Sequence, residues 1–232
     1  MTMTLPSSPG PASETREDAR ERLVAAGLEL FGEHGFAEVT TRALAARAGV
    51  NQAAIPYYFG GKEGVYLAVA AHVGELLGRL VEPVLARVEA RFAAHPARAT
   101  AALLLPEFLG GVARAVWSNP PPRSAFAFIL VEQQHPTAAL ELLEQALLLP
   151  VHRCAARLVA PLVGQEEGAR EVILLAHALV GILTAFTSGR VTLARCLGAP
   201  HPIEAELAEG AVETVETLAR AMVAGLCHPP AG

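Results

Sequence analysis

Cysteine, lysine and aromatic residues are scarce in this 232-residue chain, in which aromatic residues make up 5% of the sequence. Its three cysteines, Cys154, Cys196 and Cys227, are widely spaced and form no Cys-x-x-Cys or Cys/His pair at zinc spacing. An odd, scattered set argues against a disulfide framework and indicates a reducing compartment. Lys62 is the single lysine, and we attach little functional weight to this bias.

Targeting and membrane signals are also weak. Residues 1–12 have neither a basic start nor an apolar run, which excludes a signal peptide or anchor there, and their Pro, Ser and Gly content predicts a disordered segment. The longest apolar stretch, residues 172–186, is interrupted by His177, Gly181 and Thr184 and is shorter than the roughly 20 residues that span a bilayer. We therefore expect a cytoplasmic protein without a membrane segment.

Aliphatic residues are abundant. Hydrophobic residues account for 52% of the chain, and Ala, Leu and Val dominate them, as is typical of packed helices. No segment has the alternating pattern of a strand, so we expect an all-α protein. The length suits one or two domains, and we expect two: an N-terminal domain over residues 13–62 and a helical domain over residues 63–228.

Two short helices with a tight turn between them are predicted near the N-terminus. A first helix over residues 15–35 carries one apolar stripe and ends at Gly35. Thr40 is a good N-cap for a helix over residues 41–48, Gly49 permits a sharp turn, and Asn51 can cap a third helix over residues 52–58. This order predicts a helix-turn-helix, in which the third helix enters the major groove of DNA.

The charge pattern agrees with this interpretation. The whole chain has a net charge of −5, but residues 40–62 contain Arg42, Arg47 and Lys62 and no acidic residue. Arg42 can bind a phosphate or a base edge. Arg47 has two equally good interpretations, a phosphate contact or an ion pair with an acid of the first helix.

The outward side chains of the predicted helix-turn-helix suit DNA. Gln52 can pair with an adenine, and Ala53 and the Pro56 ring can pack on a thymine methyl group. The hydroxyl groups of Tyr57 and Tyr58 and the ammonium group of Lys62 suit phosphates. The helix N-terminus near Thr40 does so as well, because its free N–H groups attract anions. The predicted DNA-binding residues are Thr40, Thr41, Arg42, Asn51, Gln52, Ala53, Pro56, Tyr57, Tyr58 and Lys62.

Further helices are predicted from the apolar periodicity and the prolines. One begins at Lys62 and runs to about Pro83, where the proline marks a boundary or a kink, and Pro150 is expected to kink a long helix over residues 137–163. The others cover residues 84–94, 97–117, 122–134, 167–188, 190–197 and 204–226.

Residues 15–69 resemble the DNA-binding region of the TetR family of repressors. The resemblance rests on many positions together, among them Phe31, Gly35, Thr40, Gly49 and Tyr57. Residues 48–66 and 128–159 are similar to the CecR-like subgroup, so the resemblance spans nearly the whole chain. It departs at Gly27, where the family usually has alanine, which costs the helix about 1 kcal/mol, and at Pro56, which removes a helical N–H, is expected to kink or tighten the third helix, and shifts base recognition toward Gln52 and Arg42.

The resemblance implies a repressor that binds a palindromic double-stranded DNA operator as a homodimer and is released by a hydrophobic or amphipathic small molecule. Candidate effector-pocket residues are Phe108, Trp117, Phe126, Phe128, Gln133, Gln134, His152 and His177, although each taken alone is more typical of a helical core or interface than of a ligand site. Candidate residues for the dimer interface are Leu175, Ile182, Phe186, Val212, Val215, Leu218 and Met222.

Two other classes of function remain as alternatives. An enzyme is disfavoured, because the chain has no GxSxG, HExxH or phosphate-binding glycine loop, and no cofactor is expected. A metal sensor would use His152, Cys154 or His177, but residues two apart in a helix point to different sides. We therefore expect no metal site.

Overall fold

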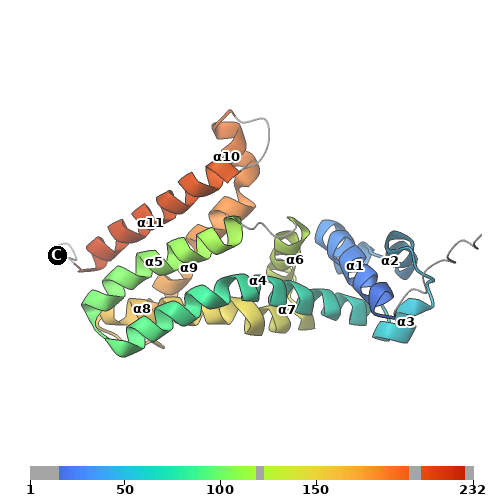
Figure 1. Ribbon diagram of the computed structural model, residues 1–232, viewed down its shortest axis with the longest axis horizontal. Helices are drawn as coiled ribbons and strands as arrows, with labels where there is room; N and C mark the ends of the chain where they lie inside the picture. The colour runs from blue at the N-terminus through green and yellow to red at the C-terminus, as the bar shows by residue number, and fades with distance from the viewer. Residues whose placement is uncertain (1–15, 119–122, 199–204, 228–232) are drawn as a thin grey trace, which may run out of the picture. The chain divides into compact units, whose positions relative to one another are not determined.

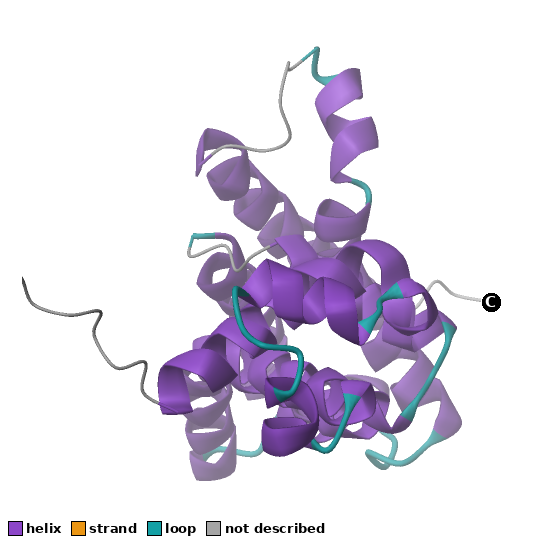
Figure 2. Ribbon diagram, turned by 90° about the vertical axis from the view of Figure 1, so that its right-hand side faces the viewer, coloured by secondary structure: helices purple, strands orange, loops and turns teal. Residues whose placement is uncertain are grey.

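The computed structural model describes residues 16–118, 123–198 and 205–227, and every regular element in these ranges is a helix (Figure 2). This confirms the all-α prediction. The predicted disorder of residues 1–12 lies outside the described residues. The chain divides into two compact units, Met1–Val69 and Ala70–Gly232.

The first unit is built from α1 (Arg16–Glu38), α2 (Thr41–Ala48), α3 (Ala54–Phe59) and the start of α4 (Lys62–Ala94). Its core contains Leu23, Phe31, Leu44 and Ile55, none of which is exposed to solvent. Gly35 has φ 71° and ψ 175°, so it interrupts α1 without forming the left-handed cap expected from the sequence, and helical turns continue to Glu38. The predicted end of the first helix at Gly35 therefore coincides with this break, and only the left-handed cap was wrong.

Helix α3 begins two residues later than predicted. The backbone N–H groups of Ala54 and Ile55 bond to the carbonyls three residues earlier, at Asn51 and Gln52, and the Asn51 side chain accepts from the N–H of Ala53 at 2.9 Å. This tight turn uses the residues that the sequence assigned to the helix. Pro56 therefore lies in the first turn of α3, where helical N–H groups have no intrahelical partner, so its ring tightens the start of the helix and does not kink it.

Helix α4 is continuous from Lys62 to Ala94 and contains Pro83. The predicted boundary at Pro83, with a separate helix over residues 84–94, was therefore wrong. Val81 and Val84 are both buried, so the apolar stripe that packs the helix continues across the exposed proline and outweighs the lost backbone bond. Residues 62–69 of α4 belong to the first unit and residues 70–94 to the second.

The second unit is a helical bundle. It consists of the rest of α4 and of α5 (Arg98–Trp117), α6 (Arg123–Gln134), α7 (Ala138–Leu143), η1 (Glu144–Leu148), α8 (Leu149–Val163), α9 (Arg170–Ser188), α10 (Arg190–Cys196) and α11 (Ala205–Cys227). Helix α11 lies along α5, and α8 packs against both α5 and α9 (Figure 1). Leu104, Phe108, Leu158 and Leu179 form part of the core between these helices.

The region around Pro150 differs from a simply kinked helix. The chain forms a π-helical turn, η1, over Glu144–Leu148, and Pro150 then lies in the first turn of α8. The helical segment Ala138–Val163 is nevertheless continuous, and the wider turn changes the backbone bonding just before the proline, whose missing N–H would interrupt a regular α-helix there. Two of the side chains near this turn, those of Leu148 and Val151, face the cavity described below.

Four helical segments in the described part of the chain are long and apolar enough, by length and composition alone, to cross a membrane: Lys62–Ala94, Arg98–Trp117, Ala138–Val163 and Arg170–Ser188. The sequence had placed the last of these below the required length, but helix α9 has 19 residues. Its most apolar window is only 22% buried, against 44–56% in the other three segments. Helix α9 therefore has an apolar surface that its own bundle leaves largely uncovered.

Candidate functional site

The arrangement of α2 and α3 follows from local sequence signals. The Thr40 hydroxyl accepts from the N–H of Ala43 at 3.1 Å and caps α2, and Gly49 (φ 65°, ψ 35°) ends it in the left-handed conformation that glycine adopts readily. Leu44 and Ile55 point inward with 0% exposure. The two helices are thereby held together, and their polar residues lie on the outer surface.

Most of the predicted DNA-binding residues lie on this outer surface. Thr41, Tyr58 and Lys62 are half-buried, and the exposed ones are Thr40, Arg42, Asn51, Gln52, Ala53, Pro56 and Tyr57. Tyr57 is 67% exposed, and its ring meets that of Tyr58 edge to face at 4.8 Å. The surface can thus offer a base edge both amide and apolar groups.

Gln52 and Thr41 are brought together across the turn. The Gln52 side-chain amide donates a hydrogen bond to the Thr41 hydroxyl oxygen at 3.0 Å. Both residues border a shallow depression that is also lined by Ala53, Ile55, Pro56 and Gly61. The bond restricts the amide to one orientation beside that depression.

The three basic residues of this region have different environments. Arg47 pairs with Glu29 of α1, which supports the second of its two interpretations. The Lys62 ammonium donates to the carbonyls of Phe36 and Val39 at 2.9 and 3.0 Å and lies 4.2 Å from the centre of the Phe36 ring. Arg42 is exposed and forms no ion pair with any described residue, so it is the basic side chain of residues 40–62 best placed for a phosphate.

The structural role of Lys62 was missed by sequence reasoning. Two of its three N–H groups bond the carbonyls at the end of α1, which joins the start of α4 to the α1–α2 connection. Carbonyls at a helix end attract cations, so this position has a general physical reason. The two carbonyls belong to Phe36 and Val39, which precede Lys62 by 26 and 23 positions, so a local sequence pattern does not reveal this contact. A phosphate contact from the remaining N–H stays a prediction.

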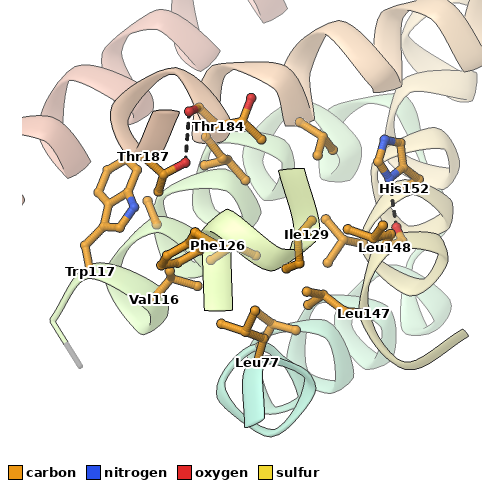
Figure 3. Close-up of a pocket in the computed structure, with 16 residues that line it drawn as sticks. Leu77, Val116, Trp117, Phe126, Ile129, Leu147, Leu148, His152, Thr184 and Thr187 are labelled. Atoms are coloured by element: carbon orange, nitrogen blue, oxygen red, sulfur yellow. Dashed lines mark hydrogen bonds between the residues drawn. The ribbon is translucent and has the colours of Figure 1, made fainter. Parts of the chain in front are cut away.

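A second candidate site is a cavity of about 130 Å³ inside the second unit (Figure 3). Side chains from α4, α5, α6, α8, α9 and η1 line it, and most of them are aliphatic or aromatic. The lining residues are Leu77, Val81, Val112, Ala113, Val116, Trp117, Phe126, Ile129, Leu147, Leu148, Val151, His152, Val180, Leu183, Thr184 and Thr187.

The predicted pocket residues divide into three groups. Trp117, Phe126 and His152 line the cavity, and His177 contacts His152 with 3.1 Å between their ring nitrogens. Phe108 and Phe128 are fully buried in the core and do not line it. The remaining two, Gln133 and Gln134, are exposed at the end of α6. Sequence periodicity could not separate these groups, because all eight lie on apolar helices.

The residues considered for a metal sensor do not gather into a binding site. Among the described residues, no group of three or more His, Cys, Asp or Glu side chains could hold a metal ion. Cys154 is buried, and the pKa of its thiol is raised to about 12, mainly by that burial and also by the charge of Glu89, while the charge of Arg157 opposes the shift. A thiol in this state is a poor metal ligand.

The predicted interface residues also differ in exposure. Val212 and Val215 are buried within the single chain on α11, the helix that packs along α5, so their side chains contribute to the core and have little area left for a partner. Leu218 is 44% exposed on the same helix. The other four, Leu175, Ile182, Phe186 and Met222, are partly exposed.

Two family models match the chain. The model described as "Bacterial regulatory proteins, tetR family" matches residues 23–69, which include α2 and α3. The model described as the C-terminal domain of the "HTH-type transcriptional dual regulator CecR" matches residues 101–226. Together they cover the candidate DNA-binding surface and most of the bundle that encloses the cavity.

Curated relatives agree with these matches. The chain is 36% identical over 178 residues to the HTH-type transcriptional dual regulator CecR of Shigella flexneri, covering 76% of this chain and 79% of that protein. It is 36% identical over 69 residues to the HTH-type transcriptional regulator BetI of Brucella canis, covering 30% of this chain and 35% of that one.

Solved structures share the fold at low sequence identity. A TetR-like transcriptional regulator from Rhodococcus sp. RHA1 has a TM-score of 0.58 at 20% identity, covering 89% of this chain and 96% of its own. The fatty acid degradation regulator FadR from Bacillus halodurans has a TM-score of 0.56 at 16% identity, covering 92% and 97%. With the family models and the Shigella relative, the conclusion is that this chain belongs to the TetR family of bacterial DNA-binding transcriptional regulators and is similar to CecR.

Proposed function

We propose that the protein is a repressor that binds a palindromic operator as a dimer and releases it when a small molecule occupies the cavity of the second unit. The observation that carries the proposal is the exposed surface formed by Arg42 on α2, Gln52 in the turn and Tyr57 on α3, which a buried core holds together. Arg42 supplies the phosphate contact and Gln52 the base contact, in the manner of a helix-turn-helix.

Dimerisation is supported by the apolar surface of α9 and α11. Ile173 and Leu174 on α9 are 53% and 59% exposed, and Leu218 on α11 is 44% exposed. Exposed apolar side chains of this size on adjacent helices favour a covering partner, and a second copy is the simplest one. A two-fold dimer that binds one operator presents its two recognition helices about 34–36 Å apart.

Release is proposed to travel through α4. This single helix begins with Lys62 in the first unit and contributes Leu77 and Val81 to the cavity wall in the second. A ligand that shifts the cavity-lining part of α4 is therefore proposed to change the distance between the two DNA-binding units of the dimer. A coupling of about 1–3 kcal/mol, or roughly 5- to 150-fold in operator affinity, suffices if the ligand prefers the released state by that amount.

The same proposal includes a cytoplasmic location without membrane insertion. The Shigella relative is named a transcriptional dual regulator. A bacterial transcriptional regulator acts on DNA, which lies in the cytoplasm. Covering α9 with a second subunit would remove its apolar surface from water without a bilayer. Purified protein that stays monodisperse without detergent is the expected behaviour.

The deciding experiment is selection of bound sequences from random double-stranded DNA. The expected product is a palindrome whose half-sites are centred about 10 base pairs apart or a multiple of that spacing. Arg42→Ala should lower affinity for every recovered sequence, whereas Gln52→Ala should relax the preference at one position of each half-site. Recovery of no sequence at low salt, or a monomer by light scattering with DNA bound, would contradict the proposal.

A further inference from the structure

The wall of the cavity has no charged side chain. Among the described residues that line it, none is Asp, Glu, Lys or Arg. The polar ones are His152, Thr184, Thr187 and the indole of Trp117, and Figure 3 shows them near the edge of a wall that is otherwise hydrocarbon. An ion placed in such a cavity would lose its hydration without gaining a counter-charge, which is strongly unfavourable.

The hydroxyl hydrogens of the wall are already used. Thr184 donates to the carbonyl of Gly181 at 2.8 Å, and Thr187 donates to the carbonyl of Thr184 at 2.9 Å. These bonds hold both hydroxyls against the backbone of α9. The threonines therefore present methyl groups and acceptor lone pairs to a ligand but no free donor.

Both ring nitrogens of His152 are also used. Nδ1 lies 2.7 Å from the carbonyl of Leu148, so it carries a hydrogen and donates. Nε2 lies 3.1 Å from Nδ1 of His177, so the two rings share one hydrogen between these nitrogens. The pair therefore satisfies itself, and His152 has no unpaired ring nitrogen for a ligand.

Trp117 is the lining residue whose polar group is not already used. Its indole N–H has no hydrogen-bond partner in the described part of the chain, while its ring packs 5.2 Å from that of Phe186. Figure 3 draws the indole nitrogen on the edge of the ring nearest to Phe126 and Thr187. One donor in an apolar wall specifies one acceptor on the ligand.

The volume limits the size of the ligand. An apolar cavity of about 150 Å³ takes up one benzene molecule. The present pocket measures about 130 Å³ and is partly open to solvent, so one ring fits inside it and a small substituent can lie toward the opening. From these observations we infer that the cavity binds an uncharged, single-ring aromatic compound with one hydrogen-bond acceptor, which receives the indole N–H of Trp117. This inference rests on the proposed function, because it names the chemical class of the effector.

The test compares four molecules of nearly the same shape by titration calorimetry. Acetophenone is neutral with one acceptor, benzoate is an anion, benzamidine is a cation, and α-methylstyrene has a methylene group in place of the acetophenone oxygen. Acetophenone is expected to bind with a dissociation constant between about 10 μM and 1 mM, as for a well-buried fragment. Benzoate and benzamidine should bind at least about 30-fold more weakly.

Two variants locate the ligand. Trp117→Phe keeps an aromatic ring but removes the donor, so it should weaken acetophenone about 5- to 10-fold and leave α-methylstyrene unchanged. Val180→Phe places a ring in the cavity and should abolish binding of both, with folding checked by circular dichroism. Tighter binding of either ion, loss of α-methylstyrene in Trp117→Phe, or no binding of acetophenone at about 5 mM would overturn the inference.

Operator release separates this inference from the proposed function. If acetophenone binds as expected but leaves affinity for the selected DNA unchanged, the cavity assignment stands and the effector mechanism fails. If a different compound releases the DNA without competing with acetophenone, release by a small molecule stands, but the placement of the effector in this cavity fails and so does the inferred class of the effector. Release by acetophenone that is lost in Val180→Phe supports both.

Discussion

The Gln52 side-chain amide donates to the Thr41 hydroxyl across the turn between α2 and α3, at 3.0 Å. Gln52 is exposed and Thr41 is half-buried, so the hydroxyl acts as a fixed support for a side chain that faces solvent. A glutamine held in one orientation before binding loses less conformational freedom when it pairs with a base. The proposed base contact of Gln52 would thus depend on Thr41, a residue of α2.

Thr41→Val is therefore expected to weaken base discrimination although its side chain keeps nearly the same shape. Gln52→Ala should cost about 1–3 kcal/mol of preference at one base pair, and Thr41→Val a smaller share, about 1 kcal/mol or less. Dissociation constants on the selected operator and its single-base variants measure both effects. Thr41→Ser keeps the hydroxyl and is the matched control; a loss equal to that of Thr41→Val would assign the effect to packing.

Arg42 and Lys62 should differ in the salt dependence of DNA binding. Arg42 has no ion-pair partner among the described residues, so Arg42→Ala should reduce the slope of log K against log salt by about 1. Lys62 bonds two carbonyls, so Lys62→Met should lower the stability of the first unit by roughly 1–3 kcal/mol and leave the slope of the folded protein nearly unchanged. Equal changes in slope would show that Lys62 also contacts phosphate.

Gly27 is expected to resist replacement by the alanine that is usual in the family. A Cβ there would lie 2.9 Å from Cγ2 of Val69 and 3.2 Å from Cγ1 of Val65, closer than carbon atoms normally approach. Alanine gains about 1 kcal/mol of helix propensity, but overpacking costs about 1–3 kcal/mol. Gly27→Ala should therefore lower the free energy of unfolding in urea slightly.

The double variant with Val69→Ala tests this explanation. Val69→Ala alone should be destabilising, because the side chain is fully buried. In that background Gly27→Ala should be clearly less destabilising than in the unaltered chain, since the closest of the colliding methyl groups is gone and the propensity gain remains. A stabilising effect of Gly27→Ala in the unaltered chain would contradict the clash.

Cys154 should contribute to a loss of stability at high pH. Burial raises its pKa from 9.0 to about 12, so the folded protein holds the proton more tightly than the unfolded chain. This contribution is fully present below pH 9 and is lost as pH rises from 9 toward 12. The free energy of unfolding of Cys154→Ala should therefore fall less steeply over that range.

Alkylation at pH 8 gives an independent check on the same thiol. Exposed Cys196 should react with iodoacetamide, while Cys154 should react only after unfolding, because its thiolate is rare and its sulfur is buried. Peptide mass spectrometry distinguishes the two sites. Labelling of Cys154 at a rate close to that of Cys196 would show that the surrounding helices open frequently.

Pro56 should be replaceable without loss of fold. It is exposed in the first turn of α3, so Pro56→Asn restores an N–H that needs no helical partner and changes stability by less than about 1 kcal/mol. The new amide faces the same surface as Gln52, so operator preference should change. Unchanged preference and affinity would mean that this position does not face a base.

Short-range sequence signals determined the elements of the candidate DNA-binding surface. Thr40 as a cap, Gly49 as a turn and the inward Leu44 and Ile55 act over a few residues, so their effect can be inferred from spacing alone. The same is true of most helices of the second unit. The late start of α3 was not predicted, because the Asn51 turn competes with the helix through equally local bonds.

Only the tertiary structure decided the partners of Lys62 and Arg47, the continuity of α4 through Pro83, and which apolar side chains line a cavity. His152 and His177 are 25 residues apart, and Trp117 meets Phe186 across 69 positions. Val215 and Leu218 follow the same helical stripe, yet one is buried against its own chain and the other is exposed. Helical periodicity states that a side chain faces something apolar, whereas packing between distant segments decides whether that is core, cavity or a second molecule.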